Sequence, residues 1–280
     1  MQRPISRRKF LGGSVILTCG AFLGYGAEVE PNRTVVTRTV MKADGASADR
    51  TVRLVQLSDL HLRKIGFHEE RIADAVHGLR PDLIVVSGDV CSYKNGDGLF
   101  ERFLALLDRT IPVYGILGNW EYWGKIDIPR LAEIYRQHNG RLLVNESVRL
   151  HYHGTDLLIT GLDDLLGGRP DLVRALDGAA PAANHLVLAH CPASRESIIR
   201  ELKKTGGFAP RYILAGHTHG GQVTLFGWAP YLPPGSGRYR YGWYGDASPA
   251  MFVSRGIGMS QLPIRFMEPP EVVCHEWHLV

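Results

Sequence analysis

The chain has 280 residues, of which 45% are hydrophobic, and this is enough to bury a sizeable core in one long domain. Its formal net charge of +4 at pH 7 arises in residues 1–27, which hold four basic residues and no acidic one. Removing these four from the 32 basic residues leaves 28, which equals the 28 acidic residues, so the body of the protein is neutral. A neutral body without a long basic run argues against nucleic-acid binding, and no nucleic-acid partner is expected.

The N-terminus predicts export. Residues 5–27 read ISRRKFLGGSVILTCGAFLGYGA, in which a basic pair precedes an apolar stretch that ends in small residues. The pair Arg7 and Arg8 within SRRKFL resembles a twin-arginine signal, which would make the export machinery for folded proteins a partner. Residues 1–27 are therefore predicted to be a twin-arginine-type export signal or an N-terminal membrane anchor that permits contact with a membrane surface. The predicted location is exported, either periplasmic or membrane-anchored and facing outside the cytoplasm.

Strand and helix patterns then alternate along the chain. Continuous apolar runs that end in Gly, Asp, Asn or His are typical of strands covered on both faces. They lie in residues 52–62, 82–91, 113–121, 185–192 and 211–221. Helical periodicity occupies residues 69–79, 99–108, 127–140 and 194–207. This alternation predicts an α/β fold with much parallel pairing.

The two ends of the body differ from this middle region. Residues 34–57 predict an opening hairpin that turns near Asp44 and Gly45. The last sixty residues are rich in Gly, Pro and Tyr, with strands expected at 250–256 and 271–279 and no good helix. No internal repeat or linker divides the chain, so residues 28–280 are predicted to form a single domain.

Polar side chains follow five of the predicted strands. They are Asp59, His61, Asp89, Asn119, His190, His217 and His219. In open α/β sheets, ligands bind beyond the carboxyl ends of the strands, so these loops should converge on one crevice. Seven nitrogen or oxygen ligands exceed the needs of one metal ion and suit two, with a carboxylate bridging them. The mixed set fits two divalent or trivalent ions (Mn, Fe or Zn) without choosing among these elements.

Each motif alone is weak evidence for a metal site. A Gly-Asp pair occurs by chance, and a single His after a strand is more often structural than a ligand. The GHTH sequence at 216–219 is stronger, because two imidazoles two residues apart beside glycines have little packing purpose. Five such motifs in order, each at a strand end, are hard to explain as separately satisfied core residues.

The order D-x-H, GD, GN, H, GHxH resembles the calcineurin-like metallophosphoesterase superfamily over most of residues 28–280. The segment SRGIGMSQLPIRFMEPPEV at 254–272 is similar to exported bacterial members, including phosphodiesterases. The resemblance implies a four-layer α/β/β/α sandwich of two mixed β-sheets flanked by helices.

The resemblance also implies the roles of the site residues. It assigns Asp59, His61 and His219 to one ion, and Asn119, His190 and His217 to the other. Asp89 would bridge the two ions. The implied reaction is hydrolysis of a phosphoester by a metal-bridging hydroxide, with His190 or His217 helping to position the phosphate. Asn119, His190 and His217 are therefore the candidate catalytic residues.

Trp120 departs from the family pattern, which has His after GN. That His is the usual acid, whereas an indole N–H can only donate a hydrogen bond. The leaving group then needs no protonation, or another residue such as Glu121, His68 or His138 replaces the acid, or the enzyme is impaired. The family includes hydrolases of a UDP-linked lipid A precursor, some with Arg at this position, so the missing His does not imply inactivity.

The sequence thus predicts a phosphodiester or pyrophosphate substrate, lipid-linked or nucleotide-linked, and a lipid or nucleotide sugar is a candidate. Trp120, Tyr122 and Trp123 are expected to pack as an aromatic wall, which either only supports the fold or also accepts a base, a sugar face or an acyl chain. Arg195 and Arg265 are secondary candidates for phosphate contact. The alternative function is a non-catalytic, metal-bound interaction scaffold of the same fold.

Overall fold

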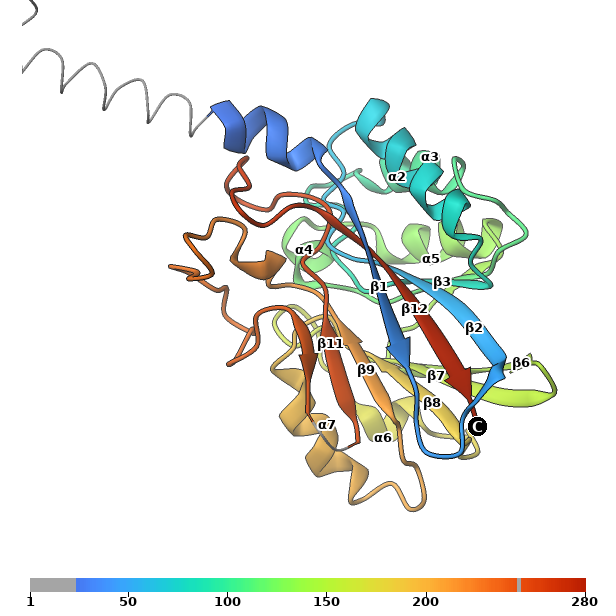
Figure 1. Cartoon of the computed structure of the whole chain (residues 1–280). Helices are drawn as coiled ribbons and strands as arrows, with labels where there is room; N and C mark the ends of the chain where they lie inside the picture. The colour runs from blue at the N-terminus through green and yellow to red at the C-terminus, as the bar shows by residue number, and fades with distance from the viewer. Residues whose placement is uncertain (1–23, 246–247) are drawn as a thin grey trace, which may run out of the picture.

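The computed structural model describes residues 24–245 and 248–280, and in it two six-stranded β-sheets pack face to face between helices (Figure 1). Most of the predicted export signal, residues 1–23, lies outside the described residues. Within the described ranges, no helix is long and apolar enough to cross a membrane.

The first sheet has the strand order β1-β12-β2-β3-β4-β5. Its strands are β1 (Val35–Met41), β12 (Glu271–Leu279), β2 (Ser47–Leu57), β3 (Leu83–Val86), β4 (Val113–Gly115) and β5 (Gly140–Leu142). Strands β2 to β5 are parallel, β12 runs antiparallel to β2, and β1 runs parallel to β12. The carboxyl ends of β2, β3 and β4 therefore lie at one edge of the sheet.

The predicted opening hairpin is wrong in its pairing. The chain does turn at Asp44 and Gly45, but β12 lies between β1 and β2 and pairs with both. The burial patterns explain this order. Strand β12 is buried along most of its length and suits an interior position, whereas alternate residues of β1 are exposed, as in an edge strand.

The second sheet has the order β10-β11-β9-β8-β7-β6. Its strands are β10 (Gly242–Tyr244), β11 (Ala250–Val253), β9 (Tyr212–Ala215), β8 (Asn184–Leu188), β7 (Thr155–Gly161) and β6 (Glu146–Tyr152). The four inner strands are parallel, and β6 and β10 are antiparallel edge strands. Both sheets are thus mixed.

Three apolar cores separate four layers. The helices α2 (Phe67–Leu79), α3 (Asp97–Leu104) and α5 (Ile128–Gln137) pack on the outer face of the first sheet. The helices α6 (Leu172–Ala175) and α7 (Ser194–Leu202) pack on the outer face of the second sheet. The middle core joins the two sheets. The predicted four-layer α/β/β/α sandwich is confirmed, and Figure 1 shows the two helix layers on opposite sides.

A chain of buried polar groups crosses the interior between the sheets. The ring of His275 in β12 lies 2.6 Å from Thr39 Oγ1 and 3.1 Å from Gln56 Oε1. Gln56 in β2 donates to Ser87 Oγ and to the Ala215 carbonyl, each at 2.9 Å. Full burial lowers the pKa of His275 to about 3, so the ring is neutral at pH 7. These bonds join β1, β12, β2 and β9 below the strand ends.

Candidate metal centre

Loops at the carboxyl ends of β2, β3, β4, β8 and β9 carry all seven predicted ligands. Asp59 and His61 follow β2, Asp89 follows β3 and Asn119 begins the short helix α4 (Asn119–Trp123). The other three follow β8 and β9: His190, His217 and His219. All seven side chains belong to buried residues. The two sheets thus contribute to one site, as the parallel pairing predicts.

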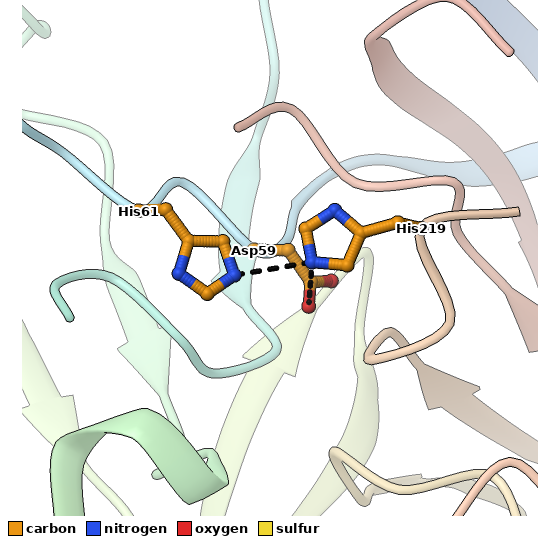
Figure 2. Close-up of side chains that lie close together, drawn as sticks. All are labelled: Asp59, His61 and His219. Atoms are coloured by element: carbon orange, nitrogen blue, oxygen red, sulfur yellow. Dashed lines mark hydrogen bonds and ion pairs between the residues drawn. The ribbon is translucent and has the colours of Figure 1, made fainter. Parts of the chain in front are cut away.

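Asp59, His61 and His219 form one group, whose ligand atoms all lie within 4.8 Å of one another. The two imidazoles point their Nε2 atoms at each other across 3.1 Å, and His219 Nε2 lies 3.5 Å from Asp59 Oδ1 (Figure 2). The rings stack with an interplanar angle of 23°. This convergence of one carboxylate oxygen and two ring nitrogens is a donor set that suits a transition-metal ion.

Asp89, His190 and His217 form a second group of the same kind. His190 Nε2 lies 3.3 Å from both Asp89 Oδ2 and His217 Nδ1. Asp89 Oδ2 is also 3.6 Å from His61 Nε2, which belongs to the first group. Asp89 therefore lies between the groups, where a bridging carboxylate would be.

The outer nitrogens of the imidazoles are held by the protein. His190 Nδ1 donates to the Ser87 carbonyl at 2.7 Å, and His217 Nε2 donates to the Pro234 carbonyl at 2.6 Å. A carbonyl oxygen can only accept, so the outer nitrogen of each of these two rings carries a proton, and the opposite nitrogen faces the site, where it can bind metal once it is unprotonated. His61 Nδ1 lies 2.6 Å from Ser92 Oγ. The rings of His190 and His217 are thus oriented with one nitrogen directed at the site.

Asn119 supplies a further test of fit. Its Oδ1 atom is buried and, within the described part of the chain, has no hydrogen-bond partner. An unpaired buried amide oxygen is costly unless something accepts its lone pairs. Asn119 lines the same cavity as Asp89, His217 and His219, so a metal ion would satisfy it. The residues therefore fit two metal ions, and the assignment of each residue to an ion stays a prediction.

Electrostatics keep most of the imidazoles neutral. Burial, reinforced by His61 and Arg265, lowers the pKa of His219 well below its usual value. Burial also lowers the pKa of His61 and of His217. Burial acts in the same direction on His190, but nearby carboxylates, led by Asp89, outweigh it and raise the pKa of His190. Burial acts to raise the pKa of Asp89, but coulombic attraction and hydrogen bonding, chiefly from His190, lower it to about 2. Its carboxylate is therefore ionised beside three imidazoles whose pKa values are lowered, and such groups bind cations.

The strand-end loops are strained. Five of the seven ligand residues have positive φ angles between 43° and 73°. They are Asp59, His61, Asp89, His217 and His219. A Cβ atom on Gly118 would lie 2.2 Å from Asp89 Oδ1, so the loop before α4 requires glycine. Strained backbone of this kind clusters at functional sites, where it positions side chains that regular structure would not.

Glu121 is a residue whose role the sequence did not reveal. Its buried carboxylate accepts hydrogen bonds from the amides of Gly118 (2.6 Å), Val90 (2.7 Å), Asp89 (3.0 Å) and Cys91 (3.4 Å). Burial, then the charge of Asp89, raises the pKa of Glu121 to about 7. The available signal was its position three residues after Gly118, where an acidic residue caps a helix. Glu121 therefore ties the Asp89 loop to the Asn119 loop.

The other residues considered for the missing acid or for phosphate contact do not line the cavity. His138 Nδ1 lies 2.9 Å from the Ile134 carbonyl at the end of α5. The buried guanidinium of Arg265 donates to carbonyls, including those of Gly258 and Glu268. Arg195 donates to the Pro249 carbonyl. Arg195 therefore supports a loop. Arg265 supports loops and also holds a predicted ligand, because its Nη2 lies 3.2 Å from His219 Nδ1.

A cavity of about 660 Å³ opens over the metal centre. Its floor includes Asp89, Asn119 and the two histidines of the GHTH motif, and its walls are mostly apolar. Trp120 and Trp123 form part of a wall, with their ring centroids 5.7 Å apart. Among the described residues that line the cavity, none is Lys or Arg. The site therefore has a charged floor and uncharged walls.

Comparisons with known proteins find relatives of this chain. The family model for calcineurin-like phosphoesterases matches residues 52–221. The uncharacterized metallophosphoesterase YkuE of Bacillus subtilis is 28% identical over 96% of this chain and 96% of its own. The uncharacterized metallophosphoesterase YkoQ of the same organism is 28% identical over 86% of this chain and 89% of its own. A solved 5'-nucleotidase precursor from Thermus thermophilus superposes with a TM-score of 0.44 at 17% identity, over 82% of this chain and 54% of its own.

Proposed function

Because this chain belongs to the calcineurin-like phosphoesterase family and is a metal-dependent hydrolase of phosphoric esters, we propose that it cleaves phosphodiester or pyrophosphate bonds. The observation that carries this proposal is Trp120, which follows Asn119 and lines the cavity where the family pattern has an acidic His. Its backbone N–H donates to Asp89 Oδ1 at 2.9 Å, which holds the residue close to the metal centre.

Trp120 affects the choice of leaving group. An indole cannot protonate a departing oxygen. Among the described residues that line the cavity, the only titratable side chains are the predicted metal ligands and the phenol of Tyr231. A leaving group that departs as a stabilised anion, such as a phosphate, avoids this need, whereas an alkoxide from a simple monoester does not. A pyrophosphate or an activated diester is therefore the favoured substrate.

The cavity walls favour a substrate with an apolar or aromatic part. Trp120, Trp123 and Tyr231 can stack on a sugar face or a base, or contact an acyl chain. The described walls hold no Lys or Arg and are mostly apolar, which suits an acyl chain better than a charged or strongly polar group. We therefore favour a lipid-linked substrate over a nucleotide-linked one.

Two ions of Mn, Fe or Zn are proposed as the cofactors. When bound, they supply Lewis acidity and lower the pKa of a water molecule so that it can attack phosphorus near neutral pH. The protein contributes Asp59, His61 and His219 on one side of Asp89, and Asn119, His190 and His217 on the other. His217 lines the cavity, which supports the proposal that it helps to orient the phosphate.

We also propose that the protein acts outside the cytoplasm, in the periplasm or tethered to a membrane. The support is the sequence of residues 1–27, with Arg7 and Arg8 ahead of an uncharged stretch at residues 10–27.

The test compares bis-p-nitrophenyl phosphate with a simple alkyl monophosphate, using protein loaded separately with Mn, Zn or Fe. We expect metal-dependent cleavage of the diester, and a loss of about 100-fold or more in Asp89→Ala, because two-metal sites depend on their shared ligand. Asp177→Ala, which changes an exposed aspartate, is the matched control. Efficient turnover of the alkyl monoester with little cleavage of the diester would contradict the proposal.

A series of diesters with progressively poorer leaving groups extends the same experiment to Trp120. The native protein should slow steeply as the leaving group becomes more basic. Trp120→His should flatten that dependence, because general acid catalysis is worth roughly 100-fold to 10,000-fold for a poor leaving group. Trp120→Phe should leave the dependence of the rate on leaving-group basicity as steep as in the native protein.

A further inference from the structure

Two loops beside the cavity present apolar side chains to solvent. Residues 222–234 and 256–264 contain no charged side chain. Phe226 is 93% exposed, Trp228 and Tyr231 are each 65% exposed, and Leu262 is 60% exposed. Leu225, Met267 and Trp123 are also exposed, and we call these seven residues the apolar rim. Single exposed apolar residues are ordinary, whereas a group gathered at the mouth of a site indicates an interaction surface.

The rim is held in place by main-chain hydrogen bonds. Leu225 and Trp228 exchange two bonds of 2.9 Å and form a small hairpin with Phe226 at its tip. Thr224 donates to the Phe266 carbonyl at 2.9 Å, which ties this hairpin to the neighbouring loop. Phe226 has a φ of 47°, a conformation that is unfavourable for a large side chain. The fold therefore maintains an exposed aromatic tip that contributes little to the cores of the protein.

The chain enters the domain beside the apolar rim. The Arg265 amide donates to the Gly26 carbonyl at 2.8 Å, and the rings of Tyr25 and Phe266 lie 6.0 Å apart. A shallow hollow is lined by Tyr25 together with Leu225, Phe226 and Met267. Figure 1 shows the first described helix close to the loop that precedes β12. The described chain begins here, at residue 24, and the sequence that precedes it is uncharged from residue 10 onward.

The apolar rim also continues into the cavity. Trp123, Tyr231 and Leu262 are exposed members of the rim and line the cavity as well. An apolar chain that starts at the rim thus meets uncharged side chains down to the metal centre. Arg63 and Arg33 lie at the edges of this surface. Arg63 donates to the Ser260 carbonyl at 3.1 Å, and Arg33 lines the hollow.

We propose that the apolar rim docks on a lipid bilayer, so that the cavity mouth faces the membrane and receives the apolar part of a phosphoester from it. This inference rests on the proposed lipid-linked substrate. Trp and Tyr are the residues that favour the interface between headgroups and acyl chains, and the two arginines complement anionic headgroups. The uncharged stretch of the chain that joins beside the rim favours a membrane over a protein partner.

Tryptophan fluorescence in vesicles of phosphatidylglycerol and phosphatidylethanolamine, brominated in their acyl chains, tests the proposal with the full chain. Bromine quenches only a tryptophan that reaches the acyl region. We expect the native protein to be quenched more than Trp228→Phe, because Trp228 enters the bilayer. Trp243→Phe, which removes a 39% exposed tryptophan from the edge strand β10, should be quenched as much as the native protein.

Phe226→Asp, which places a charge at the hairpin tip, should abolish the quenching that depends on Trp228. Val173→Asp on α6, an equally drastic change at a 52% exposed position outside the rim, should preserve it. Neither residue lines the cavity, so both variants should hydrolyse soluble bis-p-nitrophenyl phosphate at the native rate.

Equal quenching of the native protein and Trp228→Phe would overturn the proposal, and would leave a protein partner as the occupant of the rim. The soluble diester assay contains no vesicles and so reports separately on the proposed function. Hydrolysis without Trp228 quenching contradicts the docking surface alone, and quenching without hydrolysis contradicts the proposed reaction alone.

Discussion

At the residue scale, Glu121 shows how a side chain outside the ligand set can determine the metal centre. Its two oxygens each accept from two backbone amides, and those amides belong to the loops that carry Asp89 and Asn119. The distance between a predicted bridging ligand and an amide ligand is therefore fixed by one buried carboxylate. Glu121 is a positioning residue, because its oxygens are directed at the protein backbone.

Glu121→Gln tests this role. A glutamine has one acceptor oxygen, so its amide group would face backbone N–H donors and leave them unsatisfied. We expect the free energy of unfolding to fall by about 1–3 kcal/mol and the affinity for Mn to fall with it. Urea unfolding and calorimetric titration of Mn measure the two effects. Glu70→Gln, at an exposed position on α2, should change neither, and native values for Glu121→Gln would refute the role.

The sequence was most informative about single residues at strand ends. The structure brings all seven predicted ligands to one centre. The sequence could predict this because a strand pattern gives the position of the strand end, and the polar residue after it gives the candidate ligand. Glu121 was considered only as a substitute acid. Its identity was plain, but the four amides around it come from two separate loops, and no local pattern records that arrangement.

At the element scale, each predicted strand and helix segment of the alternating region contains an element of the predicted type, but the strands β5, β6, β7 and β10 were not predicted. The strand order was harder to obtain. Strands β1 and β2 have a turn between them and yet do not pair, because β12 fits between them from a distant part of the sequence. The short helices α4 and α6 were also missed, since five and four residues are too few to show a helical period.

The buried hydrogen bonds around His275, between the two sheets, predict that the free energy of unfolding depends on pH. The pKa of His275 is about 3 in the folded protein and about 6.5 in an unfolded chain, so the unfolded chain binds the proton first. The contribution of His275 is therefore fully present above pH 6.5 and is lost as the pH falls toward 3.

His275→Gln removes this titration and can keep polar contacts to Thr39 and Gln56. Between pH 6.5 and pH 5, the native protein should lose about 2 kcal/mol more unfolding free energy than this variant. Urea unfolding at the two pH values measures the difference, and metal loss affects both proteins alike. Parallel pH profiles would contradict the assignment.

At the scale of the whole molecule, several functional features share one end. The metal centre, the cavity, the apolar rim and the point where the chain enters at Tyr25 all lie beside one another. The opposite ends of the strands carry short turns such as that at Asp44 and Gly45. The functional features of the sandwich therefore lie at one end, which suits contact with a membrane surface, and the other end faces away from that surface.

Export can be tested on the intact protein. We expect Arg7→Lys combined with Arg8→Lys to retain the protein in the cytoplasm, because a twin-arginine signal depends on both guanidinium groups. Cell fractionation with immunoblotting measures the distribution, and Arg3→Lys is the matched control. Equal export of the double variant would show that residues 1–27 are read by another route.

The insertion of β12 between β1 and β2 has a consequence for how the protein is made. Thr39 and His275, which touch in the finished sheet, are 236 residues apart, so at 5–20 residues per second a ribosome takes roughly 10–50 seconds to bring out the second after the first. During this time β1 and β2 expose unpaired edges, which invite aggregation unless chaperones cover them. A nascent chain that stopped before Glu271 would carry every predicted metal ligand and still lack the strand that secures β2. Closure by β12 thus distinguishes a finished chain from a truncated one, and a translocation pathway that accepts only folded cargo would reject the latter.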